Sequence, residues 1–334
     1  MTKPLIKVRD LRKTFTFSKG SLFSKSIGRV VAVDDVNFNI NEGEILGCVG
    51  GSGSGKSTLG RAILRLIPSD KGSVMIDDVD LMTLSDEALR RRRREMQIVF
   101  QDPLYSLNPR RTVAENIARP LSNFKYPRHE IEERIRELLD DVGLDPTHAN
   151  RYPHEFSGGQ CQRIGIARAL ALQPRFLFLD EPVSALDVSI QAQILNLLAD
   201  LQEKLNLTYL FVAHDLNVVK HFSHRILVLY HGRIVETGNS EEIYDNPKHP
   251  YTKTLLDSVL SIEGGDSWEK VSVKTGTLAD NEDLDSALRA RTSAEPGCIY
   301  AATCSERLEH CVQETPEFRE ISPGHEVACH LYLR

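Results

Sequence analysis

Residues 50–57 have the sequence Gly50-Gly51-Ser52-Gly53-Ser54-Gly55-Lys56-Ser57, which fits the phosphate-loop pattern G-x-x-x-x-G-K-[ST]. An apolar run, Glu44–Val49, precedes it and an amphipathic stretch follows, so the motif has the strand–loop–helix context it requires. Backbone N–H groups of such a loop face the phosphates, the lysine reaches the terminal phosphates and the serine hydroxyl can ligate Mg²⁺. The predicted nucleotide contacts are Gly50, Ser52, Gly53, Ser54, Gly55, Lys56, Ser57 and Thr58.

Two adjacent carboxylates, Asp180 and Glu181, end the apolar run Phe176–Leu179. Successive side chains of a strand point in different directions, so the two carboxylates can serve different purposes. Asp180 suits a magnesium site together with Ser57, because carboxylate and hydroxyl oxygens are the ligands of that ion. Glu181 can face the γ-phosphate and polarise the attacking water. The pair therefore predicts hydrolysis of the bound triphosphate.

Short apolar runs alternate with helix-patterned segments, which predicts an α/β fold with a parallel sheet covered by helices. Near-continuous apolarity indicates strands that are buried on both faces. The runs are Glu44–Val49, Met96–Phe100, Arg175–Asp180, Thr208–Ala213 and Arg225–Tyr230, the last continuing through a turn into Ile234-Val235-Glu236. Residues 102–160 contain no convincing strand and predict a helical insertion. Ile6–Phe17 and Val30–Ile40 predict antiparallel strands around a loop, Ser18–Gly28.

The composition is that of an ordinary globular protein: 334 residues, 41% hydrophobic, 26% charged and a formal net charge of −6. That charge does not favour nucleic-acid binding, and the basic run Arg90–Arg94 is best explained as a solvated helix face. No apolar stretch approaches the roughly 20 residues of a membrane helix, and the N-terminus lacks the apolar core of a secretory signal. We therefore expect a cytosolic location.

A further motif, Phe156-Ser157-Gly158-Gly159-Gln160, resembles the signature sequence of ABC ATPases, which other phosphate-loop enzymes lack. A serine and two glycine amides before a helix also make an anion-binding terminus. In that family two nucleotide-binding domains face head to tail, and each signature closes on the ATP of the other domain. The resemblance implies a RecA-like P-loop NTPase core with an N-terminal antiparallel β subdomain and a helical insertion. It also implies nucleotide contacts from Ser157, Gly158, Gly159 and Gln160.

Other positions match the same family one by one. Gln101 resembles the glutamine that contacts magnesium and water, and His214 resembles the switch histidine at the γ-phosphate. Asp187, in Ser184-Ala185-Leu186-Asp187, resembles the loop that crosses the dimer interface. Phe15 is the candidate for stacking on adenine, with Val31 or Phe17 as alternatives.

The stretches Gln101–Arg110 and Pro247–Thr252 narrow the resemblance to the oligopeptide and dipeptide importer branch, which includes nickel importers. Gly51 stands where this branch usually has Glu. The resemblance implies an ATPase at the cytoplasmic face of the membrane that energises peptide uptake. Its partners would be a second, homologous ATPase subunit, two transmembrane permease subunits and an extracytoplasmic binding protein, with no nucleic acid. Alternatives are a soluble ABC ATPase acting on nucleic acid or the ribosome, an importer of nickel or another small solute, and a redox protein in which ATP is regulatory.

Four of the six cysteines gather near the C-terminus: Cys298, Cys304, Cys311 and Cys329. Four thiolates can hold zinc or a [4Fe–4S] cluster, and His310 and His330 are further ligands only in the zinc case. The branch's C-terminal extension favours iron, with zinc and free thiols left open. Cys48 and Cys161 are expected to be buried small hydrophobes. The predicted organisation is a nucleotide-binding domain over 1–260, a polar linker over 261–295 and a cysteine module over 296–334.

Overall fold

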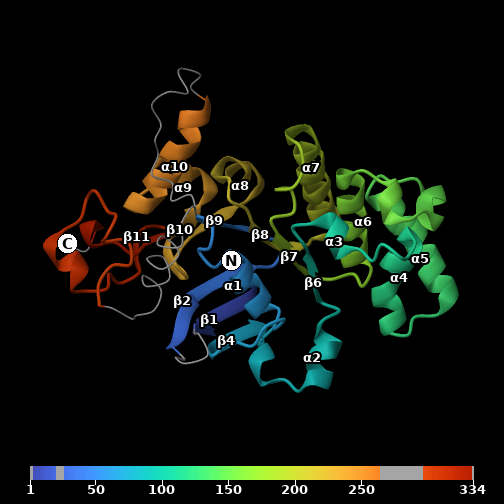
Figure 1. Cartoon of the computed structure of the whole chain (residues 1–334), viewed down its shortest axis with the longest axis horizontal. Helices are drawn as coiled ribbons and strands as arrows, with labels where there is room; N and C mark the ends of the chain where they lie inside the picture. Colours follow the sequence, from blue (N-terminus) through green and yellow to red (C-terminus); the bar gives the residue numbers. More distant parts are fainter. Residues whose placement is uncertain (1–2, 20–25, 264–295, 333–334) are drawn as a thin grey trace.

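Two sheets organise the computed structural model of the chain, which describes residues 3–19, 26–263 and 296–332 (Figure 1). The smaller, antiparallel sheet has the order β2-β1-β4-β5. Its strands are β1 (Pro4–Lys19), β2 (Ser26–Asn41), β4 (Lys71–Ile76) and β5 (Val79–Asp80). The two predicted N-terminal strands are confirmed, but they extend further than predicted, because Lys19 still pairs with Ser26 inside the expected loop.

The larger sheet has the order β11-β12-β10-β9-β3-β8-β7-β6. Its parallel strands are β3 (Ile45–Val49), β6 (Met96–Val99), β7 (Phe176–Asp180), β8 (Thr208–Val212) and β9 (Arg225–Tyr230). All five lie on the predicted apolar runs. The antiparallel strands are β10 (Arg233–Asn239), β11 (Arg319–Ser322) and β12 (His325–Val327). The predicted β9–β10 hairpin is present.

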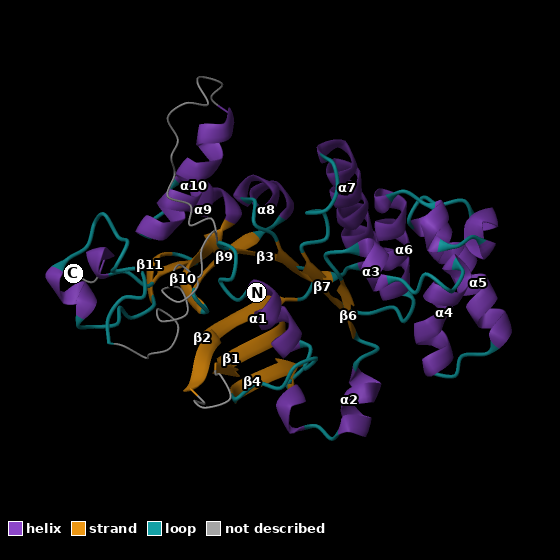
Figure 2. Ribbon diagram, in the orientation of Figure 1, coloured by secondary structure: helices purple, strands orange, loops and turns teal. Residues whose placement is uncertain are grey.

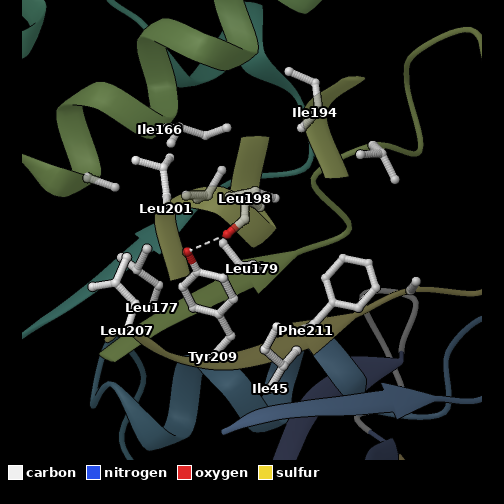
Figure 3. Packing of buried hydrophobic residues seen from close by; sticks show 14 of the residues in the cluster. Ile45, Ile166, Leu177, Leu179, Ile194, Leu198, Leu201, Leu207, Tyr209 and Phe211 are labelled. Atoms are coloured by element: carbon white, nitrogen blue, oxygen red, sulfur yellow. Dashed lines mark hydrogen bonds between the residues drawn. The ribbon is translucent and has the colours of Figure 1, made fainter. Parts of the chain in front are cut away.

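Alternate residues of the central strands enter two separate hydrophobic clusters, one on each face of the sheet. On β7, Phe176 and Phe178 join the cluster shared with the smaller sheet, whereas Leu177 and Leu179 join the opposite one. Figure 3 shows the second cluster, where the Tyr209 hydroxyl donates a hydrogen bond to the Leu198 carbonyl at 3.1 Å. Burial on both faces explains why these strands are apolar throughout.

Ten α-helices occur in the described ranges: α1 (Lys56–Ile63), α2 (Asp86–Arg92), α3 (Pro103–Ser106), α4 (Val113–Asn123), α5 (Arg128–Asp141), α6 (Gly158–Leu170), α7 (Val188–Leu205), α8 (Leu216–Phe222), α9 (Ser240–Asp245) and α10 (Pro250–Glu263). Between β6 and β7 the chain forms only helices and turns, and α4 and α5 lie at the right-hand end of Figure 2. None of the helices in these ranges is long and apolar enough to cross a membrane.

The C-terminal segment, residues 296–332, joins the main sheet instead of forming a separate body. β12 pairs with β10, placing Val327 opposite Glu236. The ring of His325 on β12 is fully buried between two carboxylates: Nε2 lies 2.7 Å from Glu236 and Nδ1 lies 3.1 Å from Glu242. The predicted linker, 261–295, begins too early, because α10 continues to Glu263; the rest of it lies outside the described residues.

Candidate functional site

The phosphate loop leaves the buried strand β3 and enters α1 at Gly55, whose φ is 108°. Only glycine fits there: a Cβ would lie 2.1 Å from the carbonyl oxygen of Ala32, and a Cβ on Gly50 would lie 2.1 Å from that of Leu229. The Lys56 ammonium is buried and donates to the carbonyls of Gly50 at 2.7 Å and Gly51 at 3.2 Å. The loop is therefore tightly wrapped around its own lysine.

Polar groups of the loop and α1 are arranged so that they can bind an anion and a cation. The Ser54 hydroxyl is buried and has no hydrogen-bond partner among the described residues, an arrangement that suits a phosphate oxygen. Ser52 and Gly53 are exposed at the tip of the loop. Ser57 donates to Asp180 at 2.6 Å, so two of the three predicted magnesium contacts, Ser57 and Asp180, lie side by side. Thr58 follows on the helix.

Asp180 and Glu181 lie at the carboxyl end of β7 and face different partners, as strand alternation predicts. Asp180 is 1% exposed and its second oxygen lies 3.2 Å from the Arg61 guanidinium. Glu181 has a φ of 48° and accepts a hydrogen bond from Gln101 Nε2 at 2.9 Å. His214, after β8, places Nδ1 3.9 Å from the same Glu181 oxygen. Two side chains that lie far from Glu181 in the sequence thus approach its carboxylate.

A small hollow of about 70 Å³ adjoins this carboxylate. Its lining includes Glu181, Ser184 and His214. Glu181, whose side chain is 17% exposed, is largely shielded from water, whereas His214 is open to it at 60%. The arrangement can hold a water molecule between a base and a polar partner, which is the geometry that hydrolysis of a phosphoanhydride needs.

The signature residues begin α6, on the other side of the main sheet from α1. Ser157 and Gln160 form a reciprocal capping box, the Gln160 N–H donating to the Ser157 hydroxyl and the Ser157 N–H to the Gln160 side chain. A Cβ on Gly159 would lie 2.4 Å from the Ile190 side chain, so that glycine permits close packing of α6 against α7. Gly158 is half-exposed. Residues of α1 and α6 belong to different hydrophobic clusters, so these two helices cover opposite faces of the main sheet.

Two further predicted contacts lie on open surface. Asp187 precedes α7 at the N-cap position, where its side chain makes no capping hydrogen bond, and it is exposed next to Val188, which is 81% exposed. Phe15 on β1 is 43% exposed and has the Lys13 ammonium 5.3 Å from its ring centre. By contrast, the Phe17 ring packs against Gly28. Phe15 therefore offers the more accessible aromatic face.

Two residues near the site were not predicted. Arg61 pairs with Asp180, and its place four residues after Ser57, on the same face of the helix, could have indicated it. Tyr251, at the start of α10, accepts a hydrogen bond from the Gly51 N–H at 2.7 Å. No local signal in the sequence indicates this contact, since the two residues are 200 positions apart.

The four C-terminal cysteines lie near one another as free thiols. Burial, with smaller contributions from the other three thiols, raises the pKa of Cys329 to about 11. Burial also raises the pKa values of Cys298 and Cys304. Within the described ranges no three His, Cys, Asp or Glu side chains are grouped so as to hold a metal ion, so this arrangement does not support the predicted cluster or zinc site. Cys48 and Cys161 are fully buried, as predicted.

Comparison with known protein families gives two matches along the chain. Residues 33–184 match the family described as ABC transporter, and residues 235–311 match that described as oligopeptide/dipeptide transporter, C-terminal region. The first covers the phosphate loop and Asp180-Glu181, and the second includes β10, α10 and three of the four clustered cysteines.

Relatives align along almost the whole chain. The oligopeptide transport ATP-binding protein AppF of Bacillus subtilis is 47% identical over 330 residues, covering 98% of this chain and 97% of its own. A putative peptide import ATP-binding protein of Brucella ovis is 44% identical over 327 residues, with the same coverage. Among solved structures, cbiO1 of Clostridium perfringens, part of an ABC transporter complex, is similar with a TM-score of 0.63 at 27% identity, covering 78% of this chain and 98% of its own. An ATP-binding cassette solved as a post-hydrolysis dimer bound to ADP and Pi has a TM-score of 0.60 at 36% identity, covering 70% and 98%.

Proposed function

This chain belongs to the ABC transporter family, and on that premise we propose that it is the ATP-hydrolysing subunit of an importer of di- and oligopeptides. The observation that carries the proposal is the gathering of Gln101 and His214 at the Glu181 carboxylate, beside Ser57 and Asp180. This combination supplies what phosphoanhydride hydrolysis requires of a protein, namely positioning and electrostatic stabilisation. The near full-length similarity to AppF supports peptides as the cargo.

Each residue has a distinct task in the proposed reaction. Glu181 takes a proton from the attacking water, while Gln101 and His214 hold that water and the γ-phosphate in line. The loop amides and Lys56 stabilise the negative charge of the phosphates. Ser57 and Asp180 would hold Mg²⁺, which when bound neutralises phosphate charge. Phe15 would stack on the adenine.

The complete site requires a second subunit. The signature, Ser157–Gln160, lies across the sheet from α1, so it would reach the phosphate loop of a partner and not its own. The exposed stretch Asp187-Val188 would lie at that interface. A relative solved as a dimer bound to ADP and Pi supports this arrangement. We expect the second ATPase to be a homologous but different chain.

Two permease subunits and an extracytoplasmic binding protein complete the proposed assembly at the cytoplasmic face of the membrane. They would select the peptide, because none of the site residues described above is specific for a cargo. The match to the oligopeptide/dipeptide transporter region over 235–311 favours peptides over nickel or another small solute. It also favours transport over an activity on nucleic acid or the ribosome.

The test is Glu181→Gln, which keeps the shape of the side chain and removes its basicity. ATP hydrolysis should fall by about two to four orders of magnitude while ATP affinity is retained. Glu203→Gln, on the exposed face of α7, is a matched control and should hydrolyse ATP normally. Hydrolysis by Glu181→Gln at a rate near that of the wild type would refute the assigned base. Loss of ATP affinity instead would place Glu181 in binding.

The four cysteines are a separate candidate site, for a metal centre. The proximity of the four thiols favours a metal centre, with [4Fe–4S] preferred to zinc. As they lie among the described residues, the thiols do not form a metal-ligand set. No step of ATP hydrolysis involves such a centre. Iron and zinc analysis of the anaerobically purified chain, against a variant with all four cysteines replaced by serine, decides between a cluster, zinc and free thiols. Loss of thermal stability alone in that variant would indicate a structural role, and loss of ATPase activity a functional one.

A further inference from the structure

The structure joins the phosphate loop to the C-terminal segment through a group of three tyrosine rings. Tyr230 ends β9, Tyr251 begins α10 and Tyr300 belongs to the C-terminal segment. Ring centres are 4.5 Å apart for Tyr230 and Tyr251, 5.2 Å for Tyr230 and Tyr300, and 5.5 Å for Tyr251 and Tyr300. The pairs are tilted or edge-to-face, the orientations that aromatic rings prefer. We call these three residues the tyrosine cluster.

The cluster contacts the loop at one end. The Gly51 N–H donates to the Tyr251 hydroxyl at 2.7 Å. The Gly51 carbonyl in turn accepts from the Ser54 N–H at 3.1 Å and from Lys56 Nζ at 3.2 Å. Gly51 thus connects the tyrosine, through its N–H, to the lysine of the phosphate site, through its carbonyl. Burial raises the Tyr251 pKa to about 12, so the hydroxyl remains neutral at physiological pH.

A second connection runs from the same cluster. The chain turns after Tyr230, and the Gly232 N–H donates to the Ser54 carbonyl at 2.7 Å. The loop is therefore held at Gly51 and at Ser54, two positions that flank its exposed tip. Gly51 does not have a positive φ, and a Cβ placed on it would lie 3.4 Å from the Tyr251 hydroxyl, an ordinary van der Waals distance.

Tyr300 holds the other two rings in place. It is buried, and its hydroxyl lies 3.2 Å from the Thr254 hydroxyl on α10. The start of α10 is fixed independently, since the Tyr251 N–H donates to Nδ1 of the buried His249 at 3.0 Å. The Tyr251 ring thus has its backbone anchored and its face covered, so its hydroxyl has little freedom to leave Gly51.

From these contacts we infer that Tyr251 is a positioning residue for the phosphate loop and that Tyr300 of the C-terminal segment keeps it in position. Tyr251 reaches the phosphate loop through its hydrogen bond with the Gly51 N–H. Its role should therefore appear in ATP binding and not in the chemical step. The inference rests on the phosphate-loop assignment proposed above.

The test is Tyr251→Phe in the full-length chain. Loss of one neutral hydrogen bond should weaken ATP binding about fivefold. KM for ATP should rise by a similar factor while kcat at saturating ATP stays within about twofold, because the loop is repositioned by ATP once bound. Tyr209→Phe is the matched control: it too removes one buried hydroxyl that is hydrogen-bonded to the backbone, here as donor to the Leu198 carbonyl, but at the far end of the strands, and it should leave ATP affinity unchanged.

A pair of variants tests the contribution of Tyr300. Tyr300→Phe keeps the ring and should retain ATP affinity, whereas Tyr300→Ala removes the support of Tyr251 and should lower it. Unchanged affinity in Tyr251→Phe, or an equal loss in Tyr209→Phe, would overturn the positioning role. Unchanged affinity in Tyr300→Ala alone would overturn the part assigned to the C-terminal segment. Lys56→Ala separates these outcomes from a failure of the phosphate-loop assignment, because ATP binding that survives that change would refute the assignment itself.

Discussion

Replacing Glu236 by Gln should loosen the C-terminal segment from the main sheet. Glu236 on β10 is fully buried, and one of its oxygens accepts from His325 and from the Lys248 N–H, each at 2.7 Å. The other oxygen accepts from the His249 N–H at 2.9 Å. This single carboxylate therefore joins β10 to β12, which is distant in sequence, and to the two residues that precede α10.

The cost of the substitution follows from those three hydrogen bonds. A glutamine amide has one oxygen and one NH₂ group. Its NH₂ group must therefore face other N–H donors, either that of His249 or those of Lys248 and His325. One buried N–H left unpaired costs about 1–3 kcal/mol, and loss of the charge-assisted bond to His325 costs a similar amount. The expected total is about 3 kcal/mol, within the range for removing one partner of a buried ion pair. If the chain unfolds as a unit, its Tm should fall by roughly 4 °C.

The loss should depend on pH. Burial alone would lower the His325 pKa, but hydrogen bonds to Glu236 and Glu242 raise it overall. A raised pKa means that the stabilisation is fully present below the unfolded value of about 6.5 and disappears as pH rises through the folded value. The difference between wild type and Glu236→Gln should therefore be largest near pH 6 and smaller near pH 9.5.

Thermal unfolding at both pH values measures the whole chain, and hydrogen exchange of residues 319–327 reports on β11 and β12. Glu326→Gln is a matched control, since its side chain points to the opposite face of β12 from that of His325. An equal stability difference at pH 6 and pH 9.5 would refute the charged pair. Unchanged exchange of β12 in Glu236→Gln would refute its role in docking the segment.

Two further predictions concern the nucleotide site. Ser57→Ala removes the hydroxyl that lies 2.6 Å from Asp180. The Mg²⁺ concentration that half-saturates ATP hydrolysis should rise about tenfold. An unchanged Mg²⁺ titration would show that Ser57 is not a magnesium ligand. Phe15→Ala should weaken the binding of ATP and of GTP by about fivefold each, because stacking does not depend on the polar groups that distinguish the two bases. Equal nucleotide affinities in wild type and variant would favour Val31 as the residue that lines the base.

The central strands were predictable because their burial on two faces requires continuous apolar sequence. Thr208–Val212 and Phe176–Asp180 have that character, and the motifs at their ends follow directly. β4 was not predicted, since only alternate residues of Lys71–Ile76 are buried. β11 and β12 were not predicted because they are short and polar. They form strands only through pairing, β12 with the edge of β10 and β11 with β12.

The site shows the same division between local and tertiary information. Ser57, Asp180 and Glu181 belong to contiguous motifs, and their juxtaposition follows from parallel strands ending at one edge. Gln101 and His214 were assigned to the site only through family resemblance, and their contacts with Glu181 were not predicted. The Tyr251 contact with Gly51 depends on how α10 packs after β10, which no local pattern encodes.

The tyrosine cluster limits how strongly the C-terminal segment can influence ATP binding. Coupling between two sites is reciprocal. If docking of the segment increases the affinity for ATP, bound ATP stabilises the docked segment by the same free energy. The connection consists of one neutral hydrogen bond at Gly51 and the packing of Tyr300 on Tyr251 and Tyr230, worth about 1–2 kcal/mol together. That corresponds to roughly a 5- to 30-fold change in affinity, far below the ~10⁴-fold difference that an all-or-none switch requires. The segment can therefore adjust the ATP concentration at which the subunit works, but it cannot by itself turn hydrolysis on or off.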